Sequence, residues 1–68
     1  NGNLIDSNLT KADLSYVNLY LTNLFRANLT RTDLTNANLL ASHLAEANLD
    51  LADLSGANLS RRSVPFRR

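Results

Sequence analysis

The sequence predicts an all-β fold, a β-solenoid in which the 68-residue chain passes through four five-residue repeats per coil. Two periodicities predict it. Leucine recurs at every fifth position from Leu4 to Leu59, twelve times without a gap, and Val64 takes the next position. Features of single repeats then return after twenty residues, which is the length of four repeats.

The five-residue period fits neither an ordinary helix nor a flat strand. On an α-helix, each leucine would be rotated by roughly 140° from the one before it. On a strand, an odd spacing would place successive leucines on opposite faces. All of the leucines share one interior only if the chain turns a corner in every repeat, and four right-angle corners close a square.

The twenty-residue period is visible in the charged residues. The only acids directly before a repeat leucine lie twenty apart, at Asp13, Asp33 and Asp53. A second column alternates in sign, at Asp6, Arg26 and Glu46. Neighbours in adjacent coils would lie ~4.8 Å apart, as in paired strands, so opposite charges there would attract across the coils. These columns predict about three coils in residues 1–60.

The repeated motif resembles the pentapeptide-repeat proteins over residues 2–61. The residues that carry the resemblance are Ala12-Asp13-Leu14, Ala27-Asn28-Leu29, Ala47-Asn48-Leu49 and Ala57-Asn58-Leu59. The resemblance implies a right-handed quadrilateral β-helix. It also implies that each leucine, with the small residue two positions before it, fills the interior while the other three positions face solvent.

The composition divides the chain into a solenoid, residues 1–60, and a C-terminal cap or basic tail, residues 61–68. The solenoid has three basic and six acidic residues, whereas the tail has four arginines and no acid: Arg61, Arg62, Arg67 and Arg68. Pro65 cannot donate a bridging hydrogen bond, which suits a terminator. The chain has no cysteine, so no disulfide holds it together. It begins with Asn1, and we expect it to be part of a longer protein.

No pattern typical of catalysis is present. There is no Gly-rich phosphate loop, no P-loop lysine and no nucleophile elbow, so we expect no enzyme activity, no cofactor and no small-molecule substrate. His43 is the single histidine and takes a position that is otherwise Asn or Asp. We interpret it as a substituted surface residue, neither catalytic nor a metal ligand. No apolar run approaches the ~20 residues of a membrane helix.

The column Asp13, Asp33 and Asp53 has three interpretations. The residues can be ordinary turn-side acids, a cation site, or a partial imitation of a row of DNA phosphates. Some relatives in the family are acidic DNA mimics that bind DNA gyrase. Here the solenoid has a net charge of only −3, and leucine replaces the frequent phenylalanine at the repeat centres. The basic tail suits acidic partners, but with one aromatic residue it argues against nucleic acid.

Apolar residues at outward positions indicate an interface. On a square coil, Tyr20, Leu21 and Leu40 share the fourth face, and Ile5 and Phe25 lie on the neighbouring first face. Grouped apolar residues on a surface often mark a binding site. We therefore predict a non-catalytic protein-interaction or scaffolding module that binds a protein partner or a second copy. The alternative is a DNA mimic that binds a topoisomerase. We favour a cytoplasmic location, with a thylakoid or chloroplast lumen as the alternative.

Overall fold

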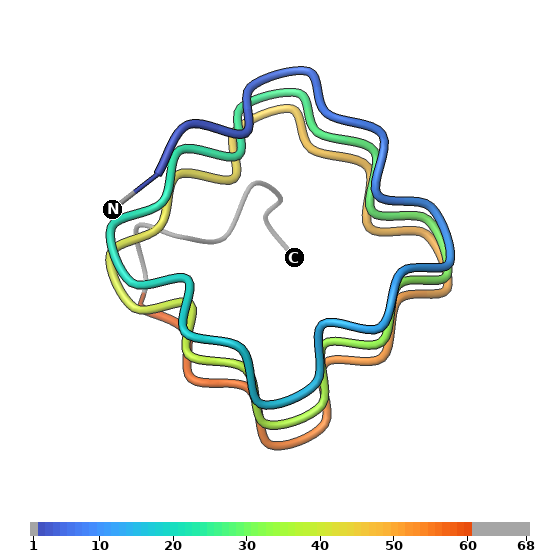
Figure 1. The fold of residues 1–68 in the computed structure, drawn as a ribbon, viewed down its shortest axis with the longest axis vertical. Coiled ribbons are helices and arrows are strands. Elements are labelled where there is room, and N and C mark those ends of the chain that lie inside the picture. The colour runs from blue at the N-terminus through green and yellow to red at the C-terminus, as the bar shows by residue number, and fades with distance from the viewer. Residues whose placement is uncertain (1, 61–68) are drawn as a thin grey trace.

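The backbone coils repeatedly over itself in the computed structural model, which describes residues 2–60 (Figure 1). Parallel bridges join residues twenty apart, such as Asn3 to Asn23 and Asp13 to Asp33. We name residues 2–20 the first coil, 21–40 the middle coil and 41–60 the last coil. The predicted twenty-residue register, with Asp13, Asp33 and Asp53 in one column, is confirmed by these bridges. The predicted cap or tail, residues 61–68, lies outside the described residues.

Each repeat turns a corner through a four-residue turn. In the first repeat the Ser7 N–H donates to the Leu4 carbonyl at 3.1 Å, and Asp6 has a positive φ of 60°. A positive φ confined to the third residue is typical of a type II turn. The same φ returns every five residues, as far as Gly56. Because a turn follows every bridge, residues 2–60 contain isolated bridges in place of longer strands.

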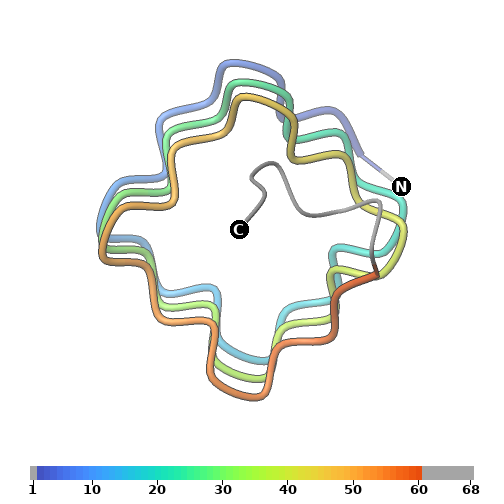
Figure 2. The same ribbon diagram turned by 180° about the vertical axis from the view of Figure 1, so that it is seen from behind.

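Backbone hydrogen bonds connect each repeat of the first coil to the middle coil at three points. Around Asn28, for example, the Leu9 N–H donates to the Asn28 carbonyl at 2.8 Å, and the Asn28 N–H donates to the Ser7 carbonyl at 2.8 Å. Two residues further along each coil, the Lys11 N–H donates to the Thr30 carbonyl at 2.9 Å. These bonds hold successive corners above one another, as Figures 1 and 2 show from opposite ends.

Between Asn3 and Asp53, the Asn or Asp before every repeat leucine except Leu44 stabilises the corner that follows it. Its Oδ1 accepts the N–H of the residue two positions on, as Asn8 does from Thr10 at 3.1 Å. Where that residue is Thr or Ser, its hydroxyl donates to the same oxygen, at 2.7 Å from Thr10 to Asn8. A short side chain with an acceptor oxygen can make this bond. Asn23, Asp33 and Asn38 are half-buried and the other Asn and Asp residues of this position are exposed, so the expectation that the position faces solvent holds for most of the coil.

The interior is a stack of leucines between layers of small residues. Five leucines have no exposed surface: Leu24, Leu29, Leu34, Leu39 and Leu44. Small and hydroxyl-bearing residues two positions before a leucine are also buried, among them Ala27, Ala37, Thr22, Thr32 and Ser42. The Thr32 hydroxyl donates to the Leu9 carbonyl at 2.8 Å. Within residues 2–60, every buried polar side-chain atom has a hydrogen-bond partner.

We expect Leu51→Gly to stabilise the fold. Leu51 has a φ of 59° and 72% of its surface is exposed, so it contributes little packing while its backbone is strained. A residue other than Gly, Asn or Asp costs roughly 1 kcal/mol in this left-handed region of positive φ. Urea unfolding should therefore give a free energy of unfolding higher by about 0.5–1 kcal/mol. The neighbouring variant Asp50→Gly, at a turn position without positive φ, should lower it.

Candidate interaction surface

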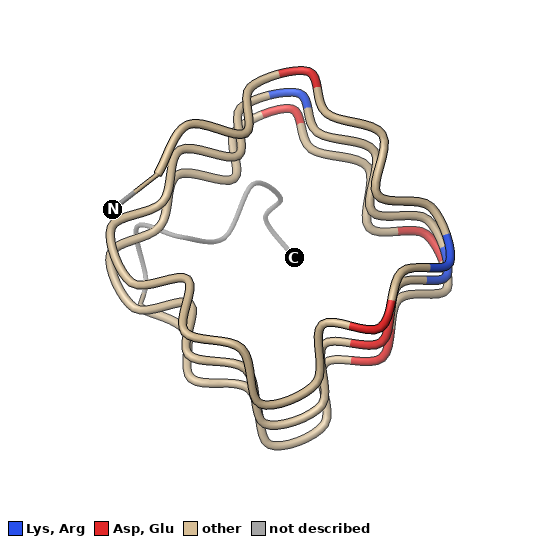
Figure 3. Ribbon diagram, viewed as in Figure 1, with Lys and Arg blue, Asp and Glu red and all other residues tan. Residues whose placement is uncertain are grey.

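The charged residues of the described chain all lie on one side of the coil. They fall in residues 6–15, 26–35 and 46–55, which the twenty-residue register stacks together. Figure 3 shows them at the upper corner and along the right of the view. We call the remainder, residues 2–5, 16–25, 36–45 and 56–60, the uncharged side. It comprises two neighbouring faces with the corner between them, and its two edges run through the corners at Ile5-Asp6 and Ser15-Tyr16.

Exposed large hydrophobic residues gather on the uncharged side. Tyr16 is 77% exposed, Leu21 49%, Tyr20 47% and Ile5 39%. Leu51 belongs to the charged side. Tyr16 is not among the predicted interface residues, yet it is the most exposed of these five large hydrophobic residues. Its column continues as Asn36 and Gly56, and that reduction in size could have been read from the twenty-residue register.

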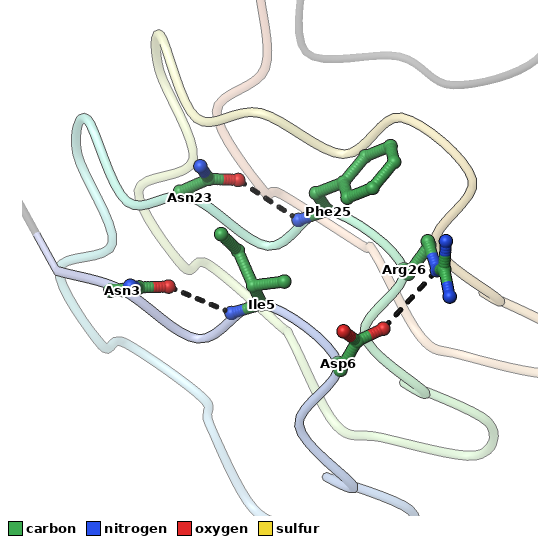
Figure 4. Close-up of polar contacts among 6 residues, drawn as sticks. All are labelled: Asn3, Ile5, Asp6, Asn23, Phe25 and Arg26. Atoms are coloured by element: carbon green, nitrogen blue, oxygen red, sulfur yellow. Dashed lines mark hydrogen bonds and ion pairs between the residues drawn. The ribbon is translucent and has the colours of Figure 1, made fainter.

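The five predicted interface residues lie at two neighbouring corners, one within the uncharged side and one at its edge, where Asp6 and Arg26 also lie. Tyr20 and Leu21 lie at one corner, where Leu40 follows twenty residues after Tyr20 in the same column. Ile5 and Phe25 lie at the next corner. Figure 4 shows Ile5 and Phe25 projecting from successive coils. Phe25 and Leu40 are half-buried, so they contribute less free surface than the two tyrosines.

Phe25 is held by its neighbours. Its ring stacks on that of His43, with centroids 5.7 Å apart and an interplanar angle of 19°. The Arg26 guanidinium carbon lies 5.6 Å from the Phe25 ring centroid. Arg26 also pairs with Asp6, with 3.2 Å between Nε and Oδ1, as the alternating column predicted (Figure 4). Both charged side chains are more than half exposed, so the ion pair orients them and adds little stability.

His43 is exposed, and its interactions differ from those of the Asn and Asp residues at equivalent positions. Its Nδ1 lies 3.2 Å from the Oδ1 of Asn23 in the coil before it, while its ring stacks on Phe25. This ring therefore links two coils at the edge of the uncharged side. The placement agrees with its interpretation as a substituted surface residue.

The acidic column is tied into its own turns. Asp13 Oδ1 accepts the Ser15 hydroxyl at 2.7 Å and the Ser15 N–H at 3.1 Å. The Ser15 hydroxyl, followed by the Ser15 N–H, holds the pKa of Asp13 below its ordinary value of 3.8. Ser55 lowers the pKa of Asp53 in the same way. Within residues 2–60, no three His, Cys, Asp or Glu side chains are grouped so that they could hold a metal ion.

A family profile described as pentapeptide repeats, in eight copies, matches residues 1–24 and 22–61. The chain belongs to the pentapeptide-repeat family. A solved relative is the pentapeptide-repeat protein Rfr23 from the cyanobacterium Cyanothece 51142, with a TM-score of 0.85 and 37% sequence identity. The similarity covers 88% of this chain but 41% of Rfr23, so the chain spans less than half of that protein. No curated protein matches.

Membership of the pentapeptide-repeat family implies a β-helix, as does the likeness to Rfr23. Neither match indicates a catalytic family. Within residues 2–60, no helix is both long enough and apolar enough to cross a membrane. The predicted basic residues Arg61, Arg62, Arg67 and Arg68 fall outside the described part of this pentapeptide-repeat chain.

We expect the acidic column to make the stability of this pentapeptide-repeat chain depend on pH. The folded-state pKa of Asp13 is lowered, so ionised Asp13 stabilises the folded chain. This stabilisation is fully present well above pH 3.8, the ordinary pKa, and is lost as the pH falls through the folded-state pKa. Asp13→Asn keeps the acceptor oxygen and loses the titration. Denaturant unfolding at several pH values should show a smaller loss of stability in acid for Asp13→Asn than for the unmodified chain.

A second variant, Ser15→Ala, tests the same account from the other partner of the hydrogen bond. It removes the hydroxyl that contributes most to the lowered pKa, so the acid-dependent loss should again be smaller than in the unmodified chain. Equal slopes of stability against pH in all three proteins would contradict this account of the column.

Proposed function

We propose that residues 2–60 form a right-handed quadrilateral β-helix of about three coils that acts as a non-catalytic protein-interaction or scaffolding module. One observation carries the proposal. All charged side chains of these residues lie on one side, while four of the five exposed large hydrophobic residues lie on the other. The docking surface is the uncharged side, with Ile5, Tyr20, Leu21, Phe25 and Leu40 as its predicted centre.

The composition of the uncharged side suits an interface. Charged residues are depleted at the centres of protein interfaces and tyrosine is enriched there. Tyrosine offers a large contact area with few rotatable bonds, so it loses little entropy on binding. Tyr16, Tyr20 and Leu21 expose apolar surface to water, so a partner that covers them is bound favourably through the hydrophobic effect.

The rigidity of the coil favours binding. Tyr16 and Leu21 occupy the third position of a turn, with φ values of 63° and 61°, and the turn bonds hold their backbone. Phe25 is fixed between His43 and Arg26. Side chains that are already ordered cost less free energy to immobilise in a complex. This surface is therefore suited to bind a partner without rearrangement.

We expect Leu21→Asp to abolish partner binding and Leu51→Asp to preserve it. The two leucines occupy the same turn position, with φ values of 61° and 59°, but lie on opposite sides. Asp tolerates this φ, so both variants should fold, as circular dichroism would show. In affinity capture from the native host, the immobilised chain and Leu51→Asp should both retain a partner protein. Leu21→Asp should not retain it. Equal losses with both variants would contradict the assignment.

The second candidate is a DNA mimic that binds a topoisomerase. The aligned carboxylates of Asp13, Asp33 and Asp53 favour it (Figure 3). Lys11 and Arg31 precede two of these acids by two residues and reduce the negative potential there. A supercoiling assay with DNA gyrase distinguishes the candidates. Inhibition that is lost in Asp33→Asn would support mimicry, whereas no inhibition at high micromolar concentration would remove it.

A further inference from the structure

One face of the uncharged side has a row of carboxamides along its middle. Parallel bridges align Asn18, Asn38 and Asn58. Oδ1 of Asn18 and of Asn38 accepts a backbone N–H of the following turn, at 3.0 Å and 3.1 Å, so the carboxamides are held in fixed orientations. We call residues 16–20, 36–40 and 56–60 the amide face. It contains no charged residue.

Both edges of the amide face become smaller from the first coil to the last. The column on one edge is Tyr16, Asn36 and Gly56, and the column on the other is Tyr20, Leu40 and Ser60. Tyr16 projects with 77% of its surface exposed, whereas Gly56 has no side chain. The face is therefore raised at the first coil and recessed at the last.

A second copy in the reversed direction complements this shape. A two-fold axis in the plane of the face, perpendicular to the coil axis, places the first coil of one copy against the last coil of the other. Tyr16 then meets Gly56 of the second copy, and Tyr20 meets Ser60 of the second copy. In the middle coil Leu40 and Asn38 each meet their own equivalents. The large residues of each copy fill the recesses of the other.

The central carboxamides can bond to each other across this axis. An amide oxygen has two lone pairs, and the Asn38 Oδ1 already accepts the Leu40 N–H. Its second lone pair can accept Nδ2–H from Asn38 of the second copy, and the reverse bond follows by symmetry. The pair leaves the turn bond of each coil in place.

The other three faces oppose the same arrangement. On the face that follows the amide face, the corner column of Asp6, Arg26 and Glu46 would place Arg26 against its own equivalent and Asp6 against Glu46. The following face, which has Asn28 in its middle, ends at the same corner column and would bring the same like charges together. On the face with the acidic column, Asp33 would meet its equivalent and Asp13 would meet Asp53. Like charges directly opposite are destabilising, so among residues 2–60 the amide face is the one that matches itself.

We propose that the chain forms a two-fold, antiparallel homodimer through the amide face. The inference rests on the proposed interaction function and names a second copy as the occupant. Interfaces of stable complexes cover ~800 Å² per partner, and one face of a 68-residue chain is small by comparison. The dimer is therefore concentration-dependent, forming in the micromolar to millimolar range.

The test is sedimentation equilibrium of the full chain from about 10 μM to 1 mM, the range expected for a small interface. Asn38→Asp keeps the turn acceptor, as Asp33 shows at an equivalent position, but places two carboxylates against each other on the axis. It should weaken dimerisation by roughly tenfold or more. Asn28→Asp makes the same change in the same coil on another face, and it should dimerise like the unmodified chain.

Cysteine cross-linking tests the geometry of the pair. The chain has no cysteine, and Leu40 is predicted to meet its own equivalent, so Leu40→Cys should form a disulfide-linked dimer under mild oxidation. Thr30→Cys occupies the corresponding turn position two corners away, is half-buried as Leu40 is, and should stay monomeric. Cross-linking of both variants alike, or of neither, would overturn the two-fold arrangement.

The result also separates this inference from the proposed function. An unmodified chain that stays monomeric up to about 1 mM would overturn the homodimer, as would an equal effect of Asn38→Asp and Asn28→Asp. If Leu21→Asp then still abolishes capture of another protein, the interaction module stands and its partner is a different chain.

Discussion

Backbone hydrogen bonds between residues twenty apart are the constraint on which the molecule depends. Each bridge is short, because a turn follows it, and no single repeat could bury a leucine by itself. Stacking resolves both problems, since it pairs the backbone of one coil with that of the next and closes the leucine layers from above and below. Leu24, Leu29, Leu34 and Leu39 are buried because the middle coil has neighbours on both sides, whereas Leu9 and Leu49 in the outer coils are half-buried.

The corners exact a conformational cost, which the side chains around them partly offset. Within residues 2–60, ten residues other than glycine adopt a positive φ near 60°, a region that most residues avoid. The Asn or Asp that precedes most of the repeat leucines compensates by accepting a backbone N–H of the turn, as Asn8 does from Thr10. Burial of leucine on one side of the turn and this side-chain bond on the other together determine where the chain bends.

Vertical register converts the sequence into surfaces. Residues twenty apart become neighbours ~4.8 Å apart, so a bias in composition that recurs with this period becomes a continuous patch. The charges of residues 6–15, 26–35 and 46–55 form one side in this way, and the tyrosines and leucines between them form the other. Binding can then be altered on one face without disturbing the interior, because outward and inward positions are separate residues of each repeat.

The sequence by itself determined the coil, its interior and its columns, because a leucine at every fifth residue has one geometric solution and the acids repeat with its period. The tertiary structure decided which outward residues are free. Phe25 is half-buried because His43 stacks on it from the next coil, and Asp13 belongs to its turn because the Ser15 hydroxyl reaches it. Such contacts depend on side-chain orientation and on neighbours twenty residues away. A five-residue pattern specifies neither, and that is why the 77% exposure of Tyr16 emerged only when the coils were stacked.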